Sequence, residues 1–549
     1  MKKFDTIRNL SLMCWVLIIQ GFSVSAVTGT KYYFYIQLSD KNGTPYSLSN
    51  PSSYLSARAI ERRSYRAPIY DSTDLPINPS YISQIEGLGV HIHSKSKWMN
   101  GVTAFISDSS LMAQIRNLKF VKFVQYTGKT DVAMPVSKIN KAPQQTQAIT
   151  YGSGDTQLKG VNGTYLHQLG YKGKGIHVAI LDAGFTNANT NPAFDSLRLR
   201  SGILGTKSIV DSNQNVYTSD NHGANVLSIM AGNIPNQYLG SAPDASYWLI
   251  QTEYAPTEYL VETDFWVSGL EYADSVGVDV VNSSLGYSSF DDASMNLTYS
   301  MLDGKTSRAS KAASLASKKG IIVCNSAGND GAKIWKYISV PADANGILTV
   351  GAVTSDSVSS SFSSYGPSAD MRIKPDICAM GTSTAYVNSM GTVTTGNGTS
   401  YSTPVIAGLV SCLLQYELKK NPSISIQTII DKIIKSGHLY NSPTPQMGYG
   451  IPNFKNAMTS IISKFDMKDI ESDVVQVSYI NNEKSIKIQL FKPNLVTVRL
   501  YTMNGCLLME RSLTDSITYI QVGHFNTGVY AVCVSAEGKI ISKKLIVNS

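Results

Sequence analysis

Three segments of the sequence contain residue types that together can carry out nucleophilic catalysis. Asp182 directly follows the apolar run Ile176–Leu181, and His222 has a glycine behind it. Ser400 precedes the apolar run 405–410. A serine hydroxyl is a poor nucleophile near neutral pH, so it needs a base to take its proton and a carboxylate to orient that base. The three segments therefore predict hydrolysis through a covalent acyl-enzyme.

Each of these residues also has an ordinary structural interpretation. An aspartate at the end of a strand is often a turn residue or a helix cap, and a lone histidine is most often a hydrogen-bonded structural group. Thr399 or Ser400 could simply cap the helix that follows. The positive end of that helix would, however, stabilise negative charge on an oxygen beside Ser400. The other six of the seven histidines lack a setting like that of His222. The three segments together are stronger evidence for catalysis than any one of them alone.

Strand-like and helical segments alternate from about residue 155 to residue 460, and these elements must position the three residues. Near-continuous apolar runs are separated by helical stretches, which is typical of a parallel sheet covered by helices on both faces. Functional loops gather at the carboxyl ends of such strands. We therefore predict an α/β domain in which Asp182 lies at the carboxyl end of a strand, and His222 and Ser400 lie at the starts of helices. The expected strands are Ile176–Leu181, Tyr247–Ile250, Val278–Val281, Ile321–Cys324 and Ile347–Val350.

The flanking regions have other patterns. Residues 31–126 alternate short strands and helices, which predicts a small α+β unit. A polar, proline-containing linker follows in 127–150 and predicts a processing site. Residues 468–549 contain short alternating strands and turn signals, which predict a small antiparallel β-domain. At the start, basic residues, a short apolar run and the small residues 24–26 predict a secretory signal, with a short membrane anchor as the alternative.

The three catalytic segments, in the order Asp, His, Ser, resemble the signature blocks of the subtilase family. That family has an Asp-Gly block, a His-Gly block and a Gly-Thr-Ser block ending in proline. The similar segments here are Asp182–Gly184, His222–Gly223 and Gly398–Pro404. The resemblance covers about 155–460, and it implies a subtilisin-like parallel sheet and a serine endopeptidase.

Further blocks extend the resemblance to the rest of the site. Asn325–Asn329 is similar to the family's oxyanion segment, and Ser284–Gly286 is similar to the wall of its primary specificity pocket. The implied site residues are Asp182, His222, Ser400 and Asn329 (oxyanion hole) for catalysis, and Ser284, Leu285, Gly286, Ala327 and Gly328 for substrate binding.

The sequence also departs from the family pattern near the site. Ala183 stands where the family usually carries a hydroxyl, so the preceding carboxylate loses one possible hydrogen bond. Ala224 replaces the usual Thr, and Tyr401-Ser402 replaces the usual Met-Ala after the nucleophile. These departures are expected to affect the reaction rate and the shape of the specificity pocket, but they do not change the predicted reaction class.

The flanking units resemble known partners of this catalytic domain. The N-terminal unit resembles the subtilase propeptide, an intramolecular chaperone and inhibitor, so the chain is expected to be a zymogen. The tail, β-sandwich-like, resembles the sorting domain of type IX secretion substrates, with an ordinary accessory β-domain as the alternative. The expected organisation is a signal peptide (1–26), a propeptide (27–130), a linker and processing region (131–154), the catalytic domain (155–460) and the sorting-like domain (468–549).

The net charge of +8 does not indicate nucleic-acid binding. Residues 27–141 hold 14 Lys and Arg against 7 Asp and Glu, so much of the positive excess lies in a segment expected to be removed. The expected partners are protein or peptide substrates, the chain's own propeptide as inhibitor, and secretion machinery that reads the C-terminal domain. No nucleic-acid partner and no transmembrane segment after the signal are expected. The expected location is outside the cell or on its surface, after export through the periplasm.

No cofactor is expected for catalysis, and the resemblance allows structural calcium without naming its ligands. None of the six cysteines has metal-ligand spacing, and a Cys506–Cys533 disulfide stays open. Two other functions also stay open: a catalytically silent subtilase fold used for surface binding, and an esterase. A silent protein should have lost a triad residue or Asn329. An esterase of the usual lineage would show Gly-x-Ser-x-Gly around its nucleophile, which is absent around Ser400.

Overall fold

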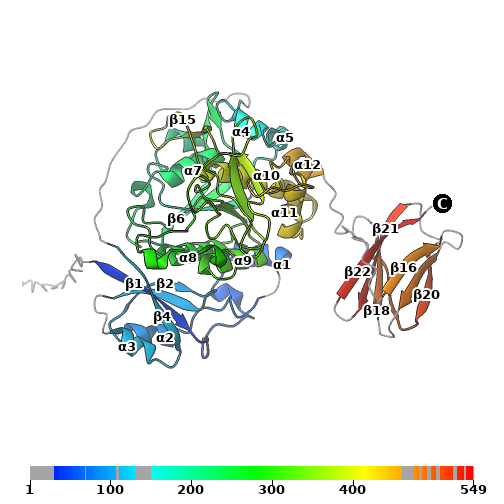
Figure 1. Ribbon diagram of the computed structural model, residues 1–549, viewed down its shortest axis with the longest axis horizontal. Helices are drawn as coiled ribbons and strands as arrows, with labels where there is room; N and C mark the ends of the chain where they lie inside the picture. The colour runs from blue at the N-terminus through cyan, green and yellow to red at the C-terminus, as the bar shows by residue number, and fades with distance from the viewer. Residues whose placement is uncertain are drawn as a thin grey trace, which may run out of the picture.

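The computed structural model describes residues 30–67, 70–106, 111–130 and 150–459, and in the C-terminal region residues 475–480, 485–490, 496–502, 507–522, 528–536 and 539–547. Figure 1 shows three folded units in the order in which the chain builds them. The predicted signal peptide and most of the predicted processing linker lie outside the described residues. None of the helices in the described ranges has the length and apolar character that a membrane span requires.

The central unit contains a seven-stranded parallel sheet, which confirms the predicted α/β fold. Its strand order is β13-β12-β11-β10-β5-β9-β6, and its neighbouring strands all run parallel. The strands are β5 (His177–Asp182), β6 (Ile203–Ser208), β9 (Ser246–Gln251), β10 (Val280–Ser283), β11 (Ile322–Ser326), β12 (Leu348–Val353) and β13 (Ile377–Met380).

Two strands of this sheet were not predicted, and both lie at its edges. β6 is mostly half-buried and includes Gly205, Thr206 and Lys207, so it lacks the continuous apolar run of a central strand. β13 has only four residues. Partial solvation weakens the hydrophobic signal of β6, whereas β13 is mostly buried and is too short for its periodicity to identify it.

Helices cover both faces of the sheet because its strands alternate two sets of apolar side chains. Val178 and Ile180 of β5 join a core with α7 and α10, whereas Ala179 and Leu181 face α8 and α9. The helices are α4 (Asp155–Lys159), α5 (Thr164–Gln168), α6 (Asp195–Leu199), α7 (His222–Ala231), α8 (Val261–Ser275), α9 (Arg308–Lys318), α10 (Thr399–Lys420), α11 (Ile426–Lys435) and α12 (Phe454–Thr459). Two short hairpins complete the unit: β7–β8 (Asn233–Ile234, Tyr238–Leu239) and β14–β15 (Thr384–Val387, Val393–Gly396).

The N-terminal unit is the predicted α+β fold, an antiparallel sheet in the order β2-β3-β1-β4. Its last strand runs to Thr130, beyond the predicted end at Val124, because it continues to pair with β1 past a bulge. The elements are β1 (Lys31–Leu38), α1 (Ala57–Arg66), α2 (Pro79–Glu86), β2 (His91–Ser96), β3 (Gly101–Ile106), α3 (Leu111–Arg116) and β4 (Val121–Thr130).

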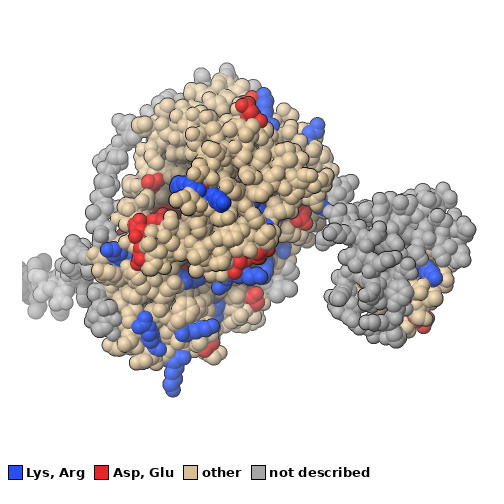
Figure 2. Space-filling model, in the orientation of Figure 1, with Lys and Arg blue, Asp and Glu red and all other residues tan. Residues whose placement is uncertain are grey.

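The N-terminal unit packs against α8 and α9 of the central unit (Figure 1). Glu271 of α8 accepts hydrogen bonds from Ser96, Lys97 and Trp98. At the end of α8, Asp274 pairs with two buried arginines of α1. Figure 2 shows several Lys and Arg side chains on the lower, N-terminal unit and acidic side chains on the central unit near their boundary. The contact is therefore charged as well as apolar.

The C-terminal unit is antiparallel, as predicted, and consists of two sheets in the orders β16-β17-β20 and β19-β18-β21-β22. Its core includes Ile486, Val498, Ile520 and Val532. Cys506 lies outside the described residues, so a bridge to Cys533 is not tested. The strands are β16 (Val475–Ile480), β17 (Ser485–Leu490), β18 (Val496–Thr502), β19 (Leu507–Leu513), β20 (Ile517–Gln521), β21 (Gly528–Ala536) and β22 (Lys539–Val547).

Candidate active site

Asp182 is the last residue of β5, at the carboxyl edge of the sheet, and it is fully buried. Its Oδ1 accepts hydrogen bonds from the Ala183 N–H (2.8 Å) and from Nδ1 of His222 (2.7 Å). Its Oδ2 has no hydrogen-bond partner in the described structure. The backbone N–H of Ala183 thus supports the carboxylate, although the hydroxyl usual at this position is missing.

His222 opens α7, a helix whose remaining nine residues are all buried. Its own N–H donates to Oδ1 of Asp220 (2.7 Å), and its side chain stays 32% exposed. Burial alone would lower the pKa of His222. The charge and hydrogen bond of Asp182, with smaller contributions from Asp220 and Glu253, more than offset this effect and raise the pKa above 6.5. The Nδ1 contact leaves Nε2 as the nitrogen available to a reacting group.

Ser400 is the second residue of α10, directly behind Gly398 and Thr399. Its Oγ donates to the carbonyl oxygen of Ser284 (3.2 Å), and no hydrogen bond joins the described side chains of Ser400 and His222. Nucleophile–base contacts are often long before substrate binds. The amino-terminal position gives the Ser400 N–H no partner four residues earlier within the helix, so it remains available to an oxyanion.

Asn329 lies three residues beyond the end of β11, and its amide orientation is set by Thr399. The Asn329 Oδ1 accepts from both the N–H (2.9 Å) and the Oγ1 (3.0 Å) of Thr399. A Cβ placed on Gly398 would lie 3.7 Å from the Ser400 nitrogen and 3.9 Å from Asn329 Nδ2. The two nitrogens therefore border the same small space, where they can act as paired donors.

The residues expected to bind substrate are brought together beside this space. Ser284, Leu285 and Gly286 follow β10, and Ala327 and Gly328 follow the adjacent strand β11. The Leu285 carbonyl accepts from Asn325 Nδ2 (3.1 Å) and from Ser326 Oγ (3.2 Å), which ties the two segments together. They form adjoining backbone walls next to Ser400.

Two other groups at the site were harder to predict from the sequence. Tyr401 stacks on Tyr386 of β14, with 4.9 Å between ring centroids, and lies 6.2 Å from the His222 ring. The carboxyl group of Glu253, two residues beyond β9, contributes to the electrostatics of His222. Their positions depend on a hairpin and on strand order. The only sequence signal was the departure from the family pattern at Tyr401.

A parallel α/β sheet that carries a buried Asp bonded to a partly exposed His, and a serine at the start of a buried helix, has the form of a serine-type hydrolase. The chain belongs to the subtilase family, whose model matches residues 173–450. Membership of this family supports the assignment of the protein as a serine-type peptidase.

Two further family models match the flanking units. The Bacteroidota peptidase S8 propeptide domain matches residues 33–147, and the secretion system C-terminal sorting domain matches residues 479–548. The predicted resemblance to a propeptide and to a type IX sorting domain is thereby confirmed. The sorting domain indicates that the protein is secreted or presented at the cell surface.

Several curated proteins are similar to this chain at modest identity. Subtilisin NAT of Bacillus subtilis subsp. natto is 25% identical over 75% of this chain and 94% of its own length. M-protease of Shouchella clausii is 26% identical over 68% of this chain and 93% of its own length. Among solved structures, the prenylagaramide maturation protease PagA covers 54% of this chain and 96% of its own, with 21% identity and a TM-score of 0.42.

Proposed function

We propose that this protein is a secreted serine endopeptidase that hydrolyses peptide bonds in proteins or peptides. Ser400 is the nucleophile, His222 is the general base and acid, and Asp182 orients the imidazole. Asn329 Nδ2 and the Ser400 N–H bind the oxyanion. Ser284–Gly286 and Ala327–Gly328 hold the substrate backbone.

In this mechanism the Ser400 hydroxyl first turns from the Ser284 carbonyl toward His222. Its oxygen attacks the peptide carbonyl carbon while His222 Nε2 takes the proton, and the Asp182 carboxylate stabilises the resulting imidazolium. The two donors stabilise the negative charge on the former carbonyl oxygen. His222 then protonates the leaving amine, and a water molecule repeats the sequence on the acyl-enzyme. No cofactor takes part in these steps, and a structural calcium ion would act only on stability.

The observation that carries this proposal is the convergence of four groups from four separate elements. The Asp182–His222 hydrogen bond, the anchored amide of Asn329 and Ser400 at a helix start all face one edge of the sheet. A silent binding protein would have no need to retain all four. For this reason we prefer the enzyme to the binding protein.

The test compares the secreted enzyme with its Ser400→Ala variant on casein and with a serine-reactive fluorophosphonate probe. In subtilisin, a relative, loss of the nucleophile lowers kcat by about 10⁶-fold, and we expect a loss of that order here. The probe should label the wild type and leave the variant unlabelled, with unchanged circular dichroism. A variant that still digests casein would rule out Ser400 as the nucleophile.

A further inference from the structure

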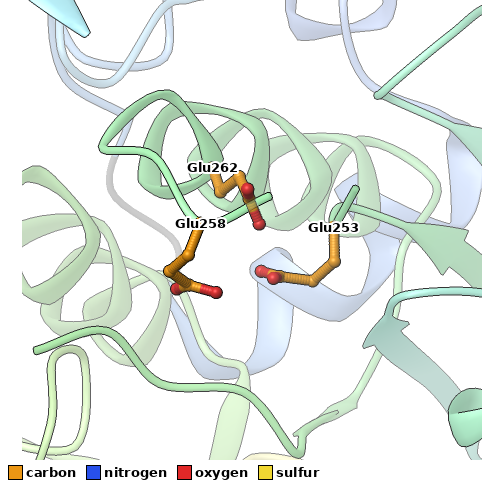
Figure 3. A group of neighbouring side chains, drawn as sticks. All are labelled: Glu253, Glu258 and Glu262. Atoms are coloured by element: carbon orange, nitrogen blue, oxygen red, sulfur yellow. The ribbon is translucent and has the colours of Figure 1, made fainter. Parts of the chain in front are cut away.

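Three glutamate side chains meet at the carboxyl edge of the sheet. Glu253 follows β9, Glu258 lies in the loop before α8, and Glu262 is in the first turn of α8. One carboxyl oxygen from each lies within 4.8 Å of the others, and Figure 3 shows the three carboxyl groups directed toward one another. No Lys or Arg is among the main charges that shift their pKa values. We call these three residues the glutamate cluster.

The cluster is buried and incompletely bonded. Glu253 is 7% exposed and Glu262 is 1% exposed. Tyr287 donates its hydroxyl to Glu253, and the Tyr259 N–H donates to Oε1 of Glu262 (3.3 Å). The other oxygen of Glu262, Oε2, is buried and receives no hydrogen bond from an N–H or hydroxyl donor among the described residues. Its carboxyl group is directed into the cluster in Figure 3, where Glu253 and Glu262 can share a hydrogen bond only when one of them is protonated.

Such a group binds either protons or a cation. Burial raises the pKa of all three carboxyl groups, to about 8 for Glu258. The charge of Glu253 raises the pKa of Glu258 and of Glu262 further, and the charge of Asp182 does the same for Glu253. Without a cation, neighbouring carboxyl groups at this distance must share protons because like charges in a buried site disfavour ionisation. A positive charge in their midst would allow all three to ionise and would satisfy the unpartnered oxygen.

The cluster adjoins the proposed catalytic residues. Gln251, the last residue of β9, pairs with Asp182, and the N–H of Thr252 donates to the Asp182 carbonyl (2.9 Å). Tyr287, which binds Glu253, directly follows the expected specificity wall 284–286. The cluster thus lies next to this wall, which under the proposed function holds the residues before the cleaved bond.

The path of the N-terminal unit points to the same place. Gly128 of β4 packs so closely on Tyr259, next to Glu258, that a Cβ there would lie 2.4 Å from the Tyr259 Cβ. The strand that leads into the processing linker therefore passes directly over the loop that carries Glu258. In sequence, that linker contains Lys138 and Lys141.

We propose that the glutamate cluster binds a lysine side chain of the peptide substrate, at a position upstream of the residue at the cleaved bond. An ammonium group has three N–H donors in a tetrahedral arrangement. Hydrogen bonds of about 2.8 Å would place three acceptor oxygens about 4.6 Å apart. The cluster offers one such oxygen from each glutamate, all within 4.8 Å of one another. The inference rests on the proposed peptidase function and names a preferred substrate class.

A metal ion fits the cluster less well. Calcium takes 6–8 oxygen ligands, whereas this cluster offers three carboxyl groups. The other groups that contact its oxygens are the Tyr287 hydroxyl and the Tyr259 N–H, both of which donate hydrogen bonds. Glu258 is half-buried, so a side chain from outside can reach the glutamate cluster from the side of Glu258.

The test uses enzyme purified after expression of the full chain and quenched fluorescent peptides that differ only by Lys or Gln at the second, third or fourth residue before the cleaved bond. We expect kcat/KM to be about 10–100-fold higher for Lys at one of these positions, the range for charge-assisted hydrogen bonds. Glu258→Gln should lower this Lys/Gln ratio at least tenfold. Asp356→Asn, the same change at an exposed carboxylate, should keep the wild-type ratio.

The outcomes separate this inference from the proposed function. Equal cleavage of Lys and Gln peptides by the wild type would overturn the inference alone, and this comparison needs no variant to fold. A ratio that persists in both Glu258→Gln and Glu262→Gln would also overturn it. A preference abolished by EDTA would assign the cluster to a metal ion instead. If no peptide is cleaved, the proposed function fails first.

Discussion

At the scale of single residues, hydrogen bonds to specific partners in the folded site orient the proposed catalytic groups. The amide of Asn329 is fixed because Thr399 supplies two donors to its oxygen, which leaves the nitrogen to face Ser400. The Asp182 carboxylate is held by the N–H of Ala183 and by His222. Pre-oriented donors of this kind need no rearrangement as charge develops.

Asn329→Ala should lower kcat without changing the fold, because it removes one oxyanion donor and leaves the nucleophile intact. The expected loss is about 10²–10³-fold, the loss that removal of one such donor causes in subtilisin, a relative. Steady-state kinetics on a peptide substrate would measure it. An unchanged kcat would assign the oxyanion role to another group.

The pH dependence of activity should report the charge around His222. The imidazole must be neutral to act as base, and its pKa is raised above 6.5, chiefly by Asp182 acting against burial. kcat/KM should therefore fall as the pH drops through a value above 6.5. Asp220→Asn removes one negative charge that raises this pKa, so the acidic limb of the variant should lie at lower pH than that of the wild type.

Asp356→Asn is the matched control for this profile, since it makes the same change at an exposed site. Its acidic limb should coincide with that of the wild type. A flat wild-type profile from pH 5 to 8 would argue against His222 as the base.

At the scale of elements, α1 ties the N-terminal unit to α8 through buried ion pairs. Arg63 is fully buried and bridges Asp74 and Asp274, and Arg62 reaches the other oxygen of Asp274. Burial would raise the pKa of Asp274, but the two arginines lower it to about 2. The contact therefore depends on charges that neither unit could leave buried alone.

Arg63→Ala in the uncleaved Ser400→Ala chain should weaken this contact strongly. Removing one partner of a buried pair costs about 3–5 kcal/mol, because the remaining carboxylates lose their compensation. Hydrogen exchange across α1 and β2 would measure the loss. Arg58→Ala is the comparison: this side chain is 30% exposed, so the loss should be smaller. Equal losses would contradict the proposed importance of burial.

At the scale of the whole molecule, the N-terminal unit and the active site are joined by a short stretch of chain. β4 ends at Thr130, and the central unit is described from Thr150. A tethered segment of this length that entered the active site would reach Ser400 at high effective concentration. We expect the chain to cleave itself within residues 127–150 and to keep the released propeptide bound as an inhibitor.

Cleavage should therefore be intramolecular, with a rate that does not depend on protein concentration. Ser400→Ala should accumulate as the unprocessed form when expressed alone. N-terminal sequencing of the secreted enzyme is the decisive measurement. A mature protein that starts near Val27 would mean that the N-terminal unit is retained. It would rule out the assignment of this unit as a removable inhibitor.

Local sequence patterns were sufficient to predict the fold class and to nominate Asp182, His222 and Ser400, whereas Asn329 was nominated by the family resemblance. Continuous apolar runs separated by helices require a sheet buried on both faces, and the Asp182, His222 and Ser400 segments carry local signatures that do not depend on long-range packing. Edge strands such as β6 were missed because partial solvation weakens the same signal.

Contacts between residues far apart in the chain became visible only in the folded molecule. Even the glutamate cluster, whose members Glu253, Glu258 and Glu262 lie within ten positions of one another, required the folded path of the chain from β9 into α8. The link between Arg63 and Asp274 spans 211 positions in the chain. Such contacts depend on strand order and on the docking of one unit against another, which local propensity and periodicity do not encode.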